Sequence, residues 1–110
     1  MTPIDLGSYK SIYLQTAKEY IDKMSVSLEK LENNALDKEA LNNLHIASHS
    51  LKSQSQVMGF IHIANLCLSI EKTSNEALKG NSQLIHKDIS DIKQAVDEIS
   101  LKLAQIEKMP

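Results

Sequence analysis

The chain has 110 residues, 42% of them apolar, and a formal net charge of −2. This length suits one domain with its own core, and the apolar fraction excludes a disordered chain, so residues 1–110 are expected to form a single domain. The sequence holds no arginine and no basic surplus, which argues against nucleic-acid binding. Only 3 glycines and 2 prolines occur, too few for the turns of an all-β protein.

The first helix is expected over about residues 8–32, because apolar side chains recur there at steps of three and four. This stripe consists of Leu14, Ala17, Ile21, Met24, Leu28 and Leu31, flanked by Tyr13 and Tyr20. Asn33 and Asn34 form a stop signal. The second helix is expected from about Asp37, a suitable N-cap, to Met58, after which Gly59 ends it or marks close packing.

The third helix is expected over about residues 60–79, with Gly80 as its stop. Its inward residues are predicted to be Ile63, Leu66, Cys67, Ile70 and Ala77. The fourth is expected over about residues 83–108, with Ser82 as a possible cap. A stripe of Ile85, Ile89, Ile92, Val96, Ile99, Leu103 and Ile106 follows it. The stripe is interpreted as core, with a dimer seam as the alternative; we expect a monomer.

The short connections favour antiparallel neighbours, so the predicted fold is all-α, an up-down-up-down four-helix bundle. An extended coiled coil is the alternative, but three loop signals at regular spacing argue against it. No stretch approaches the ~18 apolar residues of a membrane span, and residues 1–7 are too short and too mixed for a signal peptide. We therefore expect a soluble cytoplasmic protein with no membrane partner. The single cysteine, Cys67, is expected to be buried.

His49 is the candidate functional residue. At about 100° per residue, Ala40, Leu44, Ala47, Leu51 and Met58 fall on one side of the second helix. His45, His49, Lys52, Ser53 and Gln56 fall on the other. A solvent-facing imidazole suits a nucleophile that another macromolecule must reach, because much of it is uncharged at neutral pH.

Attack on a phosphoryl group requires a cation nearby and a hydrogen bond that holds the distal ring nitrogen. Lys52, one helical turn after His49, meets the first requirement. Glu71 is the candidate for the second. Glu71 lies twelve residues after Gly59, and His49 lies ten residues before Gly59. If the second and third helices are antiparallel, His49 and Glu71 should therefore lie at similar heights along the bundle axis. A solvated helix residue is the alternative reading of Glu71.

The run from His49 to Gly59 resembles the signature of histidine phosphotransfer (HPt) domains, His-x-Leu-Lys-Gly-x-Ser-x-x-apolar-Gly. The matching positions are His49, Leu51, Lys52, Ser55, Met58 and Gly59. The segment from Phe60 to Glu71 also resembles the third helix of that family, most closely in the phosphoacceptor domain of chemotaxis-type histidine kinases.

The resemblance implies a phosphorelay intermediate of two-component signalling, which is not itself an enzyme and needs no cofactor. His49 would be the phosphoacceptor, Lys52 its stabiliser and Glu71 the partner of its ring. The donor would be a histidine kinase domain that binds ATP, or the receiver aspartate of a hybrid kinase. The acceptor would be the aspartate of a response-regulator receiver domain.

The family usually has glycine after the lysine, where this chain has Ser53. This difference predicts altered docking of a receiver. We expect the partner surface to include His45, Ser53, Gln56 and Gly59. One alternative is an HPt-like interaction module without phosphotransfer. Another is a metal-binding bundle built on His45 and His49, but no further ligand is placed to complete a site, so no metal is expected.

Overall fold

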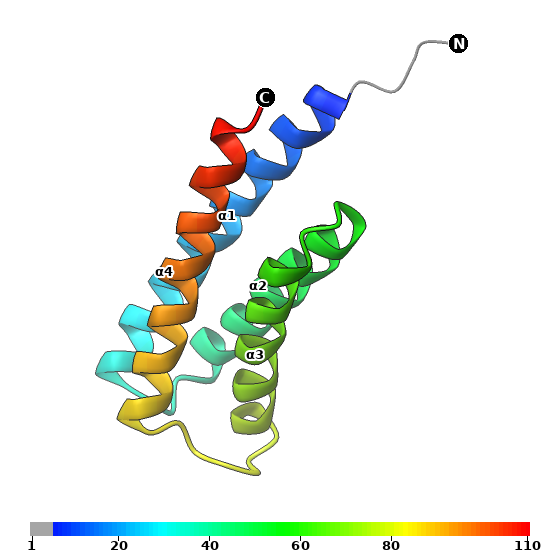
Figure 1. The fold of residues 1–110 in the computed structure, drawn as a ribbon. Helices are drawn as coiled ribbons and strands as arrows, with labels where there is room; N and C mark the ends of the chain where they lie inside the picture. Colours follow the sequence, from blue (N-terminus) through cyan, green and yellow to red (C-terminus); the bar gives the residue numbers. More distant parts are fainter. Residues whose placement is uncertain (1–5) are drawn as a thin grey trace.

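The computed structural model describes residues 6–110, with side chains from residue 8. Over this range it contains four helices, α1 (Leu6–Asn33), α2 (Lys38–Val57), α3 (Ile61–Leu78) and α4 (His86–Lys108), and no strand. α1 and α3 each pack against both α2 and α4, so the chain runs up and down around a ring (Figure 1). The predicted antiparallel four-helix bundle is confirmed. It is elongated, with extents of 50 × 24 × 19 Å.

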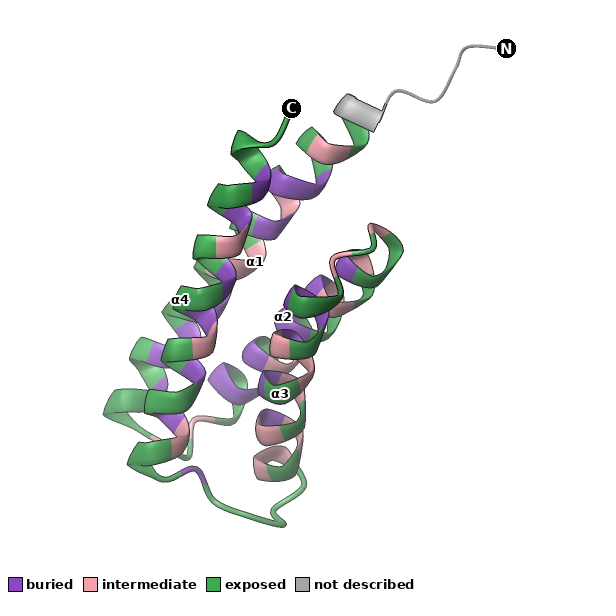
Figure 2. Cartoon of the chain, in the orientation of Figure 1, coloured by how far each residue is buried: buried purple, intermediate pink, exposed green. Residues whose placement is uncertain are grey.

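The core is formed by one face of each helix, and Figure 2 shows the buried residues on the sides of the helices that face the bundle interior. All but one residue of the predicted α1 stripe are buried, and Ile21 is half-buried. In α4 every stripe position from Ile89 to Ile106 is buried. Cys67 is fully buried in α3, as expected. No helix in the described part of the chain is both long and apolar enough to cross a membrane.

Two glycines end helices in the left-handed conformation. Gly59 has φ +80° and follows α2; its N–H donates to the carbonyl of Gln56, and the N–H of Phe60 donates to that of Ser55. This pair of bonds is a Schellman motif, which satisfies carbonyls at the helix end. Gly80, with φ +77°, ends α3 in the same way. A Cβ on Gly59 would meet no atom within 4 Å, so backbone conformation and not close packing explains this glycine.

The prediction for the start of the fourth helix was wrong. α4 begins at His86, so Ser82 and Gln83 lie in the preceding loop. The N–H of Ile85 donates to Oδ2 of Asp88 at 2.9 Å, and this contact closes the first turn. Ile85, predicted to face the core, is 59% exposed, and Leu84 is buried in its place. Ile85 precedes the helix, so the helical spacing that places the other stripe residues in the core does not apply to it.

Candidate functional site

His49 lies in the middle of α2 and presents its ring to solvent. Oδ1 of Asp37 accepts a hydrogen bond from the N–H of Ala40 at 3.0 Å, which confirms Asp37 as the N-cap. Leu44, Ala47 and Leu51 are buried on the opposite side of the helix. The His49 side chain is 57% exposed. The outward facing predicted from helical periodicity is therefore confirmed.

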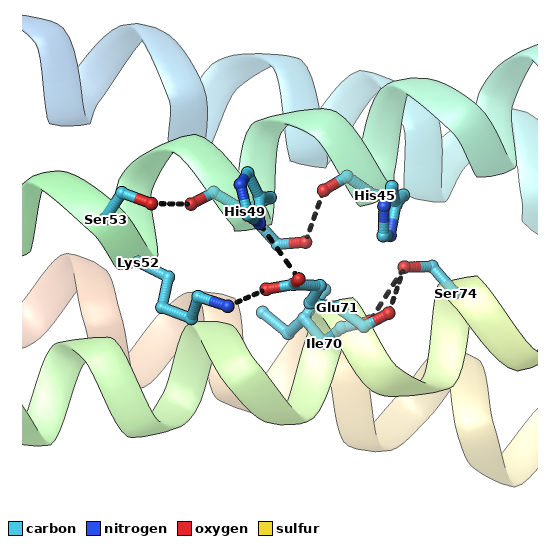
Figure 3. Close-up of polar contacts among 8 residues, drawn as sticks. His45, His49, Lys52, Ser53, Ile70, Glu71 and Ser74 are labelled. Atoms are coloured by element: carbon cyan, nitrogen blue, oxygen red, sulfur yellow. Dashed lines mark hydrogen bonds and ion pairs between the residues drawn. The ribbon is translucent and has the colours of Figure 1, made fainter.

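Glu71 reaches His49 from α3, the antiparallel neighbour of α2. Nδ1 of His49 lies 2.9 Å from Oε1 of Glu71 (Figure 3). Since a carboxylate only accepts hydrogen bonds, this contact places a proton on Nδ1 and leaves the lone pair on Nε2. The two residues lie at matching heights, as their distances from Gly59 predicted. The attacking nitrogen of a nucleophilic histidine would thus be Nε2.

The same carboxylate also binds Lys52. Nζ of Lys52 lies 2.7 Å from Oε2 of Glu71, and Figure 3 shows the two contacts on opposite oxygens of one carboxylate. The Lys52 side chain is only 17% exposed and that of Glu71 16%. Lys52 was expected to face water beside His49; instead it points toward α3. The helical wheel of α2 missed this because Lys52 lies on the edge of the polar face that borders α3.

Glu71 is held in its charged form. Burial alone would raise the pKa of this carboxyl group, but hydrogen bonds from Lys52 and His49 outweigh burial and lower the pKa below its ordinary value of 4.5. A charged carboxylate is the form that stabilises a proton on Nδ1 of His49. In contrast, burial, with a further contribution from Glu71, raises the pKa of the nearby Cys67 thiol to about 12. Cys67 therefore stays protonated at neutral pH and is not a competing nucleophile.

The predicted partner-binding residues surround His49 unequally. Ser53 and Gln56, one and two turns later, are exposed, as is Gly59 at the end of α2. The hydroxyl of Ser53 donates to the carbonyl of His49 at 3.1 Å, so it is turned back onto its own helix. His45, one turn earlier, is half-buried and lies on the side of α3. Its ring is nearly parallel to that of His49, with centroids 6.4 Å apart.

One set of supporting contacts was not predicted. Ser55, a residue of the signature, is fully buried, and its hydroxyl lies 2.8 Å from that of Tyr13 in α1. The Tyr13 ring packs against Phe60, with centroids 5.2 Å apart. These contacts fix the end of α2 against α1 and hence the height of the site. The available signal was the position of Ser55 on the inward arc of α2, between Leu51 and Met58.

The described residues contain no group of three or more histidine, cysteine, aspartate or glutamate side chains arranged to hold a metal ion. His45 and His49 lie one turn apart, and the carboxylate beside them, that of Glu71, is occupied by Nδ1 of His49 and by Lys52. The arrangement instead suits a nucleophilic imidazole that is oriented from one side and open on the other.

Known proteins share this sequence pattern and fold. The model of the Hpt domain family matches residues 8–105. Chemotaxis protein CheA of Bacillus subtilis is 21% identical over 103 residues, which cover 94% of this chain and 15% of that protein. CheA of Halobacterium salinarum is 22% identical over 102 residues, covering 93% and 15%. The chain thus spans less than a fifth of the length of these relatives.

Solved structures agree with these matches. The CheA phosphotransferase domain from Thermotoga maritima superimposes with a TM-score of 0.88 at 28% identity, over 92% of this chain and 96% of that one. A histidine phosphotransfer domain of CheA gives a TM-score of 0.87 at 27% identity, over 93% and 77%. Hpt domains are phosphocarrier modules of two-component signalling and not enzymes. With nearly its whole length matched, the chain belongs to the Hpt domain family.

Proposed function

We propose that this domain carries a phosphoryl group on Nε2 of His49. It receives the group from the ATP-binding domain of a chemotaxis-type histidine kinase, or from a receiver aspartate of a hybrid kinase, and passes it to a response-regulator receiver aspartate. The observation that carries the proposal is the 2.9 Å contact from Nδ1 to Glu71 on a ring that is otherwise exposed. Because ATP and receiver domains are cytoplasmic reactants, the proposed location is the cytoplasm.

The transfer step follows from the tautomer. The lone pair on Nε2 attacks the phosphorus of the γ-phosphate of ATP, or that of an aspartyl phosphate. A nitrogen–phosphorus bond forms while the phosphorus–oxygen bond to the leaving group breaks, and ADP or the aspartate carboxylate departs with that electron pair. Nε2 carries no proton, so no base is needed to remove one. Positive charge develops on the ring, and the carboxylate of Glu71 balances it through Nδ1.

Lys52 is proposed to stabilise the phosphoryl group after transfer. In the structure its Nζ neutralises Oε2 of Glu71, the carboxylate whose other oxygen holds His49. When the ring gains charge, Glu71 pairs more strongly with His49, and the competing interaction with Lys52 weakens. The phosphoryl oxygens then offer Lys52 a second anionic partner within one helical turn.

The partner is proposed to dock on the exposed edge of α2, over Ser53, Gln56 and Gly59, with His45 at the far end. The contact would be modest in area, since a relay protein must release each partner. The inward turn of the Ser53 hydroxyl leaves mainly its methylene group at the surface. Ser53 therefore adds bulk where the family has glycine, and Ser53→Gly is expected to speed transfer to a receiver.

The test is phosphorylation by two kinds of donor. The domain is incubated with a chemotaxis-type kinase domain and labelled ATP, and separately with a phosphorylated receiver. The expected product is an acid-labile, alkali-stable label that is absent in His49→Gln. His62→Gln is a matched control, because His62 is also exposed and also contacts a glutamate, Glu98, at 3.0 Å.

The two functions under comparison give opposite results. Label on the wild-type domain and on His62→Gln, but not on His49→Gln, supports the relay. No label from either donor, with helical circular dichroism and thermal unfolding intact, supports the alternative of an interaction module without phosphotransfer. Label on His49→Gln would show that another residue is the acceptor.

A further inference from the structure

The donors nearest to His49 are already engaged. Glu71 binds Nδ1 of His49 through one oxygen and Nζ of Lys52 through the other. The hydroxyl of Ser53 donates to a backbone carbonyl of α2. A phosphoryl group on Nε2 brings negative charge spread over three oxygens, so a donor besides Lys52 can add to its stabilisation. His45 is the remaining polar ring on this part of α2.

The His45 ring has an unusual environment. Its Nδ1 is buried and has no hydrogen-bond partner among the described residues. Figure 3 places His45 above Ser74 of α3, but the hydroxyl of Ser74 is committed to the carbonyls of Ile70 and Glu71, at 2.9 and 3.1 Å. Buried polar atoms without partners are rare in folded proteins, so this one requires an explanation.

The environment of Nδ1 determines where the proton of His45 resides. A buried N–H without an acceptor loses the hydrogen bond that water would give it. The proton of the neutral His45 ring is therefore more stable on Nε2 than on the buried Nδ1. Nε2 of His45 is therefore a hydrogen-bond donor, whereas Nε2 of His49 carries a lone pair. Within the described residues, no hydrogen bond engages the His45 ring.

His45 lies beside the ring that would carry the phosphoryl group. It precedes His49 by one helical turn, so the two side chains are neighbours on one face of α2. The two ring planes are inclined by only 20°, and their centroids are 6.4 Å apart. This distance is within the range of neighbouring rings in contact. Since phosphoryl oxygens extend beyond the ring of His49, a group on Nε2 comes close to the neighbouring ring of His45.

We propose that His45 is a second phosphoryl-binding residue, whose Nε2–H donates a hydrogen bond to an oxygen of the phosphoryl group on His49. This inference rests on the proposed function of His49. The unpartnered Nδ1 supports it, because a proton is disfavoured on that nitrogen and the N–H of the neutral ring is therefore on Nε2. The competing explanation is a histidine that only fills space between α2 and α3.

The experiment uses phosphoramidate, a small phosphodonor that transfers to histidine without a protein partner. His45→Phe keeps a ring but removes both nitrogens, and His45→Gln restores an N–H at a similar reach. The exposed His86, at the start of α4, provides the control His86→Phe. We expect labelling of His49 to be about tenfold slower in His45→Phe, to recover in His45→Gln, and to be unchanged in His86→Phe.

Nitrogen-15 NMR of the imidazole rings gives a readout that packing alone would not change. The unmodified domain should show His45 protonated on Nε2, and this resonance should move when His49 is phosphorylated. Equal labelling rates in wild type and His45→Phe, or a His45 resonance that does not move, would overturn the inference. So would the failure of phosphoramidate to label His49. Labelling by phosphoramidate but by no protein donor would instead count against the proposed relay and leave the His45 result standing.

Discussion

Replacing Glu71 by glutamine separates the charge of the site from its shape. The amide keeps the size of the carboxylate and can still accept a hydrogen bond from Nδ1 of His49. A hydrogen bond to a charged group contributes about 1.5–3 kcal/mol and a neutral one about 0.5–1.5 kcal/mol. The substitution therefore removes about 1–1.5 kcal/mol of stabilisation as positive charge develops on the ring, and phosphorylation should slow about tenfold.

The assay is the initial rate of labelling of His49, measured with phosphoramidate and with a kinase domain and ATP. Glu98→Gln is the matched control, because Glu98 makes the same type of contact with His62 at 3.0 Å on the exposed faces of α3 and α4. Its rate should equal that of the wild type. If Glu71→Gln were labelled within about twofold of the wild-type rate, the negative charge of Glu71 would not stabilise the developing charge on the ring, and that part of the proposed mechanism would be wrong.

Further predictions concern the scaffold and its pH dependence. Leu51→Ala, in the fully buried face of α2, should lower the free energy of unfolding in urea by roughly 2–5 kcal/mol, whereas exposed Leu101→Ala should change it by less than about 0.5 kcal/mol. Gly59→Ala, at φ +80°, should cost about 1–2 kcal/mol, and Gly59→Asn less; equal melting temperatures for all three proteins would contradict the left-handed cap. Because the folded-state pKa of Glu71 is lowered, its carboxylate stabilises the fold above pH 4.5, and this contribution is lost as the pH falls further, through the folded-state pKa. Glu71→Gln should lack that part of the loss in urea titrations below pH 4.5; an identical acid dependence would show that Glu71 has no such role.

The architecture was predictable because local signals and periodicity agree. Asp37, Gly59 and Gly80 mark helix ends by mechanisms that act within a few residues, and each acts in the structure as predicted. The apolar steps of α1 and α4 identify the core face without reference to any other helix. The height of Glu71 against His49 followed from counting to Gly59, since two antiparallel helices of equal rise meet at a known register.

The features that were not predicted depend on contacts between side chains of different helices, or on a single side-chain contact at a helix end. The spacing of apolar residues within one helix does not show such contacts. Lys52 turns toward α3 because the Glu71 carboxylate is there, and a helical wheel of α2 contains no information about α3. The start of α4 depends on one side-chain contact, from Asp88 to the N–H of Ile85. The unpartnered Nδ1 of His45 likewise depends on the side chains that the other helices place around it, which a helical wheel of α2 does not show.

The chemistry and the stability of this domain are located on different sides of α2. Leu51 is fully buried among core residues, whereas His49, two positions earlier, is mostly exposed and its ring binds a carboxylate on the neighbouring helix. Truncating His49 therefore removes little buried apolar area, and truncating Leu51 removes no group that can reach a phosphoryl donor. Substitutions at His49 should abolish labelling with little change in unfolding, and substitutions at Leu51 should do the reverse in the fraction that remains folded. A parallel loss of both properties in either variant would mean that the orientation of the ring depends on core packing and not on Glu71.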